Sequence, residues 1–137
     1  MIRKNIPFDF VLDYLVPLEV IIKPMFGMHA IYVAEKMVLV LCQRTKNMES
    51  NGVWIATSHK HHKSFKKEFR SLRSVFKYAN NDKETEWQLL PEDADDFEKS
   101  VIQVCELIKQ NDPRIGRIHK RPKTKSKSSV GPKKPSR

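Results

Sequence analysis

Apolar side chains recur at helical spacing in three segments of the chain. The first segment predicts a helix over residues 8–16, whose buried face consists of Phe8, Val11, Leu12 and Leu15. The second predicts a helix over residues 59–77, whose apolar stripe consists of Phe65, Phe69, Leu72 and Phe76. The third predicts a helix over residues 91–113, whose buried face consists of Phe97, Val101, Val104 and Ile108.

Five shorter runs are rich in β-branched and aromatic residues, and they predict strands over residues 20–26, 30–34, 37–42, 52–56 and 85–90. Pro24 cannot donate a ladder hydrogen bond, which favours an edge position for the first strand. The pairs Gly27-Met28 and Glu35-Lys36 are short enough for hairpin turns. The chain is therefore predicted to be an α+β domain. An antiparallel sheet of about five strands, a β-meander, packs with three helices in the order α-β-β-β-β-α-β-α.

The strand predicted over residues 37–42 is apolar at every position. A strand with one face in water alternates apolar and polar side chains, so both faces of this strand are expected to be covered. Helices would cover one face. The other would be covered by a further helix or by a partner subunit, which makes a homodimer one alternative.

Charge is unevenly distributed along the chain. The net charge is +10, yet residues 1–113 hold 16 basic and 16 acidic residues, and residues 114–137 hold ten basic residues and no acidic one. This C-terminal part has no apolar periodicity, so it cannot bury enough apolar surface to offset the entropy lost on ordering. We therefore expect a domain over residues 1–113 and a disordered basic tail over residues 114–137.

Two groups of cations are candidates for binding nucleic acid. On the helix predicted over residues 59–77, a basic ridge consists of Lys66, Arg70, Arg73 and Lys77. In the tail, the candidates are Arg117, Lys120, Arg121, Lys123, Lys125, Lys127, Lys133 and Lys134. A polycation attracts polyanions by counterion release, so DNA or RNA is expected to bind without sequence preference at ~10⁻⁴ to 10⁻⁶ M. The alternatives are a merely solvated helix face and, for the tail, a solubilising or linker role or an acidic protein surface.

The histidines and the acidic residues offer little for metal binding or catalysis. His59 and His62 have the i, i+3 spacing of metal ligands on a helix, but the lysines around them would repel a cation. The acids at residues 92–98 suit the positive end of a helix. No metal, no other cofactor and no catalytic residue is expected, because a nucleophile motif and a glycine-rich phosphate loop are both lacking.

Two further features are expected to be structural. Cys42 and Cys105 lie in apolar runs, as buried thiols do. In Met25-Phe26-Gly27, the glycine is expected to turn the chain while the other two side chains pack. No run approaches the ~20 apolar residues of a bilayer span, and the N-terminus has no apolar signal core, so a cytosolic protein without a membrane partner is expected.

Several of these segments are similar to one known family. Over roughly residues 20–110 the chain resembles the N-terminal domain of the TfoX/Sxy competence regulators, with MmcQ/YjbR-like proteins as the runner-up. Met25-Phe26-Gly27 is similar to the family's Met-Phe-Gly-Gly signature, although Met28 replaces the second glycine. The other matching segments are Ile31-Tyr32-Val33 and Lys36-Met37 in a hairpin, and Trp87 with Leu90-Pro91-Glu92 near the end.

The resemblance and the charge pattern together lead to an expected function. The family implies a non-enzymatic regulatory or adaptor domain in transcription, with a protein partner such as a transcription factor of the cyclic-AMP receptor type. The basic tail adds non-specific binding of nucleic acid. The alternatives are a small ligand-binding or enzymatic domain with a site on the sheet face, and a purely structural homodimer.

Overall fold

The computed structural model describes residues 6–45, 48–76 and 84–118. Within these ranges the elements follow one another as α1 (Phe10–Leu15), β1 (Val20–Met25), β2 (Met28–Val33), β3 (Lys36–Cys42), β4 (Gly52–Ile55), α2 (His62–Glu68), β5 (Arg73–Phe76), β6 (Glu84–Pro91) and α3 (Phe97–Lys109). Two 3₁₀ turns, η1 (Met48–Ser50) and η2 (His59–His61), precede β4 and α2. The predicted α+β class is confirmed, with one more strand than expected.

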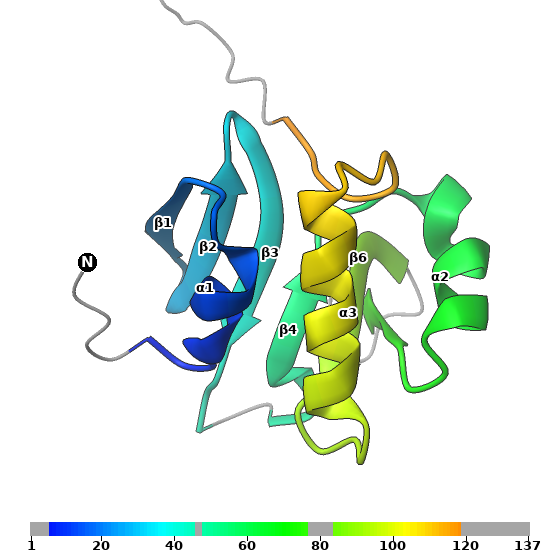
Figure 1. Ribbon diagram of the computed structural model, residues 1–137. Helices are drawn as coiled ribbons and strands as arrows, with labels where there is room; N and C mark the ends of the chain where they lie inside the picture. Colours follow the sequence, from blue (N-terminus) through cyan, green and yellow to red (C-terminus); the bar gives the residue numbers. More distant parts are fainter. Residues whose placement is uncertain (1–5, 46–47, 77–83, 119–137) are drawn as a thin grey trace, which may run out of the picture.

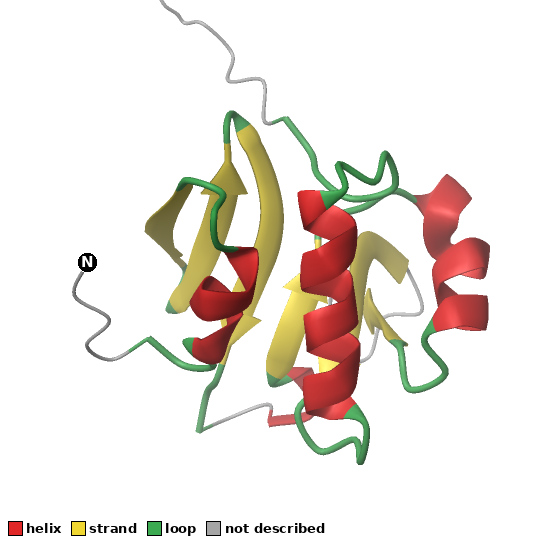
Figure 2. Ribbon diagram, in the orientation of Figure 1, coloured by secondary structure: helices red, strands yellow, loops and turns green. Residues whose placement is uncertain are grey.

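One antiparallel sheet contains the six strands in the order β1-β2-β3-β4-β6-β5 (Figure 2). The first four strands form the predicted meander. β6 then pairs with β4, and β5 pairs with the far side of β6. β1 lies at one edge, where Pro24 needs no hydrogen-bonding neighbour on its outer side, so the predicted edge position is confirmed.

The helices pack against one side of the sheet. α1 and α3 lie in front of it, and α2 stands beside α3 next to β6 (Figure 1). Their apolar side chains form one core with the facing strand residues, and its fully buried members include Leu15, Ile31, Leu39, Ile55 and Phe65. None of the described helices is long and apolar enough to span a bilayer.

β3 is covered on both faces, as its sequence predicted. On the helix side, Leu39 and Leu41 join the main core. On the opposite side, which we call the helix-free face, Val40 and Cys42 belong to a second buried cluster. Partly buried side chains of the sheet itself pack over that cluster, namely Met25, Tyr32, Trp54 and Trp87. The burial of β3 therefore does not depend on a second subunit.

The helix predicted over residues 59–77 is wrong in its second half. α2 ends at Glu68, and Phe69 already has extended backbone angles. Arg73 and Ser74 then pair with Leu89 and Gln88 of β6. The apolar stripe correctly predicted that Phe65, Phe69 and Leu72 are buried. A short helix and a turn bury them, however, and not one long helix. The partner strand decides this conformation, because β5 satisfies backbone groups that β6 would otherwise expose at an edge.

Residues 114–118, which were expected in the tail, pack against the domain. Ile115 is only 3% exposed and belongs to the main core. The backbone of Arg117 exchanges two hydrogen bonds with Met37, at 2.9 and 3.0 Å, and Gly116 donates to the carbonyl of Ala56. The rest of the predicted tail, residues 119–137, lies outside the described residues.

Candidate nucleic-acid interface

The basic ridge predicted on one long helix is divided in the structure. The amine of Lys66 on α2 donates to Ser74 Oγ at 2.9 Å, on the helix side of the sheet. Arg73 is the neighbour of Ser74 on β5, and because adjacent residues of a strand point to opposite faces, it lies on the other side of the sheet. Its Nη2 lies 3.0 Å from Asp93 Oδ1. Arg70 is exposed in the connection between α2 and β5, and Lys77 lies outside the described residues. These four cations therefore do not form one continuous row.

A different set of cations lies on the outer side of α2 and at its two ends. We call Lys60, Lys63, Lys67 and Arg70 the α2 basic row; all four side chains are exposed. Lys63 and Lys67 are one helical turn apart and lie opposite Phe65, which is fully buried. Within the described ranges, none of the four forms an ion pair. Two lysines at i, i+4 repel each other by a few tenths of a kcal/mol, so the row does not serve the stability of α2.

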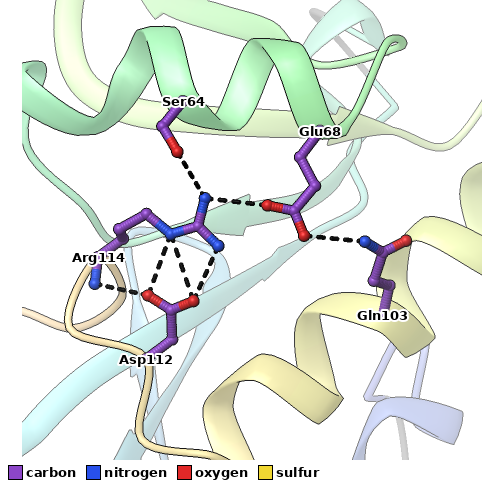
Figure 3. Close-up of polar contacts among 5 residues, drawn as sticks. All are labelled: Ser64, Glu68, Gln103, Asp112 and Arg114. Atoms are coloured by element: carbon purple, nitrogen blue, oxygen red, sulfur yellow. Dashed lines mark hydrogen bonds and ion pairs between the residues drawn. The ribbon is translucent and has the colours of Figure 1, made fainter.

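Arg114 fastens the start of the C-terminal segment to this helix (Figure 3). Its guanidinium contacts Glu68 Oε1 at 2.9 Å and Ser64 Oγ at 2.7 Å, both on α2. It also lies over the ring of Phe65, 4.5 Å from the ring centre. Gln103 on α3 donates to the other oxygen of Glu68 at 2.9 Å. The network thus joins α2, α3 and the C-terminal segment.

The charges in this network stabilise one another. The side-chain hydrogen bonds from Arg114 hold the pKa of Asp112 below its usual value. Hydrogen bonds to Asp112 and Glu68 in turn raise the pKa of Arg114. The side chain of Arg114 is only 17% exposed. Arg114 therefore serves the fold of the domain, and it is not a free cation for a polyanion.

The backbone of Arg117 pairs with Met37 at the start of β3, and its side chain extends from there toward β6. Its guanidinium forms an ion pair with Glu86 on β6. The other carboxylate oxygen of Glu86 lies 3.7 Å from His59 Nδ1 in η2, just before α2. The predicted site residues that follow Arg117 lie outside the described residues, namely Lys120, Arg121, Lys123, Lys125, Lys127, Lys133 and Lys134. The described chain therefore ends beside the start of β3, and the Arg117 side chain links it through Glu86 to η2.

The two histidines considered as metal ligands lie close together, with ring centres 5.0 Å apart. Both ring nitrogens of His62 are used within the domain. Nδ1 lies 3.2 Å from Gln88 Nε2, and Nε2 lies 2.9 Å from the carbonyl of Glu86. Because an amide nitrogen can only donate, Nδ1 accepts and Nε2 carries the proton. The described residues hold no group of three or more metal-ligating side chains.

The cysteines are buried, as predicted, and unsuited to nucleophilic chemistry. Both are free thiols. Burial raises the pKa of Cys105 to about 12 and also raises the pKa of Cys42. Only the thiolate is a strong nucleophile, and at neutral pH both groups are protonated.

One small pocket lies between β3, the end of α3 and the C-terminal segment. Its polar lining comes from Lys36, Asn111 and Asp112. Its space of about 20 Å³ suffices for a single water molecule. This pocket is too small for an organic substrate.

The Met25-Phe26-Gly27 motif differs from expectation. Gly27 turns the chain as predicted, at a φ of +80°. Phe26, however, does not pack: its side chain is 87% exposed, and its φ is +51°. Positive φ at both central residues is typical of the type I′ hairpin turn.

Two sets of residues on these surfaces escaped sequence reasoning. The α2 basic row was missed because helix length was misjudged, although Lys63 and Lys67 were visible beside the predicted ridge. The role of Arg114 depends on side chains 46 or more residues away in sequence, for which no local pattern gives a signal.

The chain matches no family model, no curated protein and no solved structure.

Proposed function

We propose that this chain is a non-enzymatic regulatory or adaptor domain that binds DNA or RNA without sequence preference through the α2 basic row and the basic tail. One observation carries the proposal: Lys63 and Lys67 are exposed on the outer side of α2, with the exposed Lys60 just before this helix and the exposed Arg70 just after it. Another part of the body would contact a protein partner, as the resemblance to the TfoX/Sxy regulators implies.

The spacing of the row suits a phosphate backbone. Lys63 and Lys67 lie one turn apart on α2, so their Cβ atoms are about 5–6 Å apart, and Lys60 precedes them in η2. Lysine is a compact point charge that attracts phosphate without the bidentate geometry used to read bases. We therefore expect attraction to the backbone and little discrimination between sequences.

The test compares three chains in gel-shift titrations with mixed DNA and RNA at about 50 and 200 mM salt. The first is the full chain. The second ends after Ile118, because cutting earlier would remove Ile115 from the core. The third carries Lys63→Gln and Lys67→Gln in the full chain. Circular dichroism melting first establishes that each variant is folded.

We expect the full chain to bind most tightly and to lose affinity steeply with salt, since each phosphate contact contributes about 0.9 to the slope of log K against log salt. The double variant should lower that slope by about two. The single variants Lys63→Gln and Lys99→Gln are measured alongside as a matched pair, because both replace an exposed lysine in a helix with the same change of charge. Equal effects of Lys63→Gln and Lys99→Gln would contradict a role for the row. Unchanged binding after truncation would contradict a role for the tail.

A further inference from the structure

A row of side chains crosses the whole helix-free face, with one residue from each strand. Directly opposite residues in neighbouring antiparallel strands project from the same face of a sheet. The register pairs Lys23 with Ala30, Ala30 with Val40, Val40 with Trp54, Trp54 with Leu89, and Leu89 with Arg73. The row therefore begins and ends with a cation, and a tryptophan stands near its middle.

Aromatic rings flank this row on three strands. Trp54 on β4 and Trp87 on β6 meet edge to face, with ring centres 5.8 Å apart. Tyr32 on β2 lies under the amine of Lys23, which is 5.1 Å from the ring centre. All three rings are only partly buried, so each covers the buried Val40 cluster while part of it remains in water. The three rings and the two terminal cations form what we call the aromatic face.

The rings are held in place before any ligand arrives. The indole nitrogen of Trp54 donates to the carbonyl of Ser50 at 2.9 Å, and Trp87 packs against that ring. A side chain that is already ordered loses little further entropy when a ligand binds.

We infer that the aromatic face binds single-stranded nucleic acid, whose bases stack on Tyr32, Trp54 and Trp87. Sheets that bind single strands combine aromatic side chains for stacking with cations along the phosphate path. Here Lys23 and Arg73 supply the cations at the two edges. A duplex hides its bases within the stack, so it cannot use the rings in this way. This inference concerns a different surface from the α2 basic row, and it stands or falls separately.

Arg73 is available for such a contact although it is paired with Asp93. The ion pair is on the surface, where the side chains are 45% and 76% exposed. Exposed pairs of this kind contribute little to stability, so a phosphate can replace the carboxylate at little cost.

Tryptophan fluorescence is an intrinsic probe of the aromatic face. The chain has two tryptophans, and both lie on the aromatic face, so intrinsic fluorescence reports on this surface alone. The full chain is titrated with oligo(dT) and oligo(U) of about 15 nucleotides, with a duplex of similar length and with heparin, a polyanion without bases. Binding is followed in parallel by the anisotropy of labelled oligonucleotides and by competition with unlabelled heparin.

We expect both single strands to quench tryptophan fluorescence saturably, and heparin and the duplex to bind with little quenching. Trp87→Leu should weaken single-strand binding about tenfold while duplex binding is unchanged. Lys23→Gln tests the same face at an exposed position, so a loss of fold is not an explanation for its effect. The Lys63→Gln, Lys67→Gln variant should keep the quenching, which separates this inference from the proposed function.

Three results would overturn the inference. The first is single-strand binding seen by anisotropy without any change in tryptophan emission. The second is equal quenching by heparin and oligo(dT), because heparin has no bases to stack. The third is a blue shift of tryptophan emission with rising protein concentration, together with a dimer in sedimentation, because the aromatic face would then be covered by a second copy.

Discussion

Arg114 holds Asp112 through one edge of its guanidinium: Nη2 lies 2.8 Å from Oδ2, and Nε lies 3.1 Å from Oδ1. The backbone N–H of Arg114 also donates to Oδ1, at 2.8 Å. The same side chain reaches Glu68 on α2. A short local contact thus orients an arginine that ties the C-terminal segment to a distant helix.

Replacing Arg114 with Ala should destabilise the domain. The substitution leaves Asp112 and Glu68 without their cation and removes the contact with the Phe65 ring. Because the arginine is mostly buried, we expect a loss of about 2–3 kcal/mol in the free energy of unfolding. Urea denaturation measures this loss. Arg70→Ala, at an exposed position, should change stability by less than about 0.5 kcal/mol; equal effects of the two substitutions would contradict the structural role of Arg114.

Asp112 should make the domain sensitive to acid. Its pKa in the folded protein is held below the ordinary value of an aspartate by hydrogen bonds from Arg114. A carboxyl group with a lowered folded pKa contributes stability above its unfolded pKa and loses that contribution as the pH falls through the folded pKa. We expect the wild type to lose stability faster than Asp112→Asn below about pH 4. Urea midpoints measured between neutral and acid pH test this, and parallel curves for the two proteins would contradict it.

Phe26→Asn should stabilise the protein. Phe26 is 87% exposed at a φ of +51°, where asparagine is far better tolerated than a bulky residue. The resulting Asn-Gly pair is the favoured type I′ turn, so we expect a gain of about 0.5–1 kcal/mol in thermal or urea unfolding. Phe8 is the matched control, because it also has positive φ but its ring packs against Phe97 at 5.2 Å. Phe8→Asn should therefore destabilise the fold, and a loss of stability in Phe26→Asn would refute the interpretation.

Gly52→Ala should be much more damaging than Gly27→Ala. Gly52 has a φ of +144°, and an added Cβ would collide with the carbonyl oxygen of Leu90 on the neighbouring strand. Both partners are backbone in the middle of the sheet, so neither can move freely. We expect a loss of more than about 3 kcal/mol. At Gly27 an added Cβ meets open space, so only the strain of positive φ, about 1 kcal/mol, should appear. Similar stabilities of the two variants would show that the β4–β6 contact is looser than described.

Local patterns predicted the meander well. β1, β2 and β3 follow closely the apolar runs seen in the sequence, and the hairpins between them are short. Both turns are shifted by one residue toward the N-terminus, to Phe26-Gly27 and Ala34-Glu35, and Ala34 adopts a φ of +56°. Such shifts arise because a two-residue turn is set by the pairing of both strands, which single-residue preferences do not specify.

The candidate surfaces were less predictable. Lys63 and Lys67 lie on α2 beside the predicted ridge, which the true end of this helix divides, and the sequence pattern did not single them out. Trp54 and Trp87 lie 33 residues apart in sequence, and only the pairing of β4 with β6 brings their rings together. The order of the strands in the sheet decides how exposed a side chain is and which side chains lie beside it. The periodicity within each strand carries no information about that order.

The sequence by itself determined the α+β class, the burial of β3 on both faces and the segregation of positive charge toward the C-terminus, because these follow from spacing and composition. Only the tertiary structure decided that residues 73–76 form a strand, that Arg114 and Ile115 belong to the domain, and that aromatic rings gather on the helix-free face. The physical reason is the same in each case. The free energy of these features comes from partners far away along the chain, and it outweighs local preference where the two disagree.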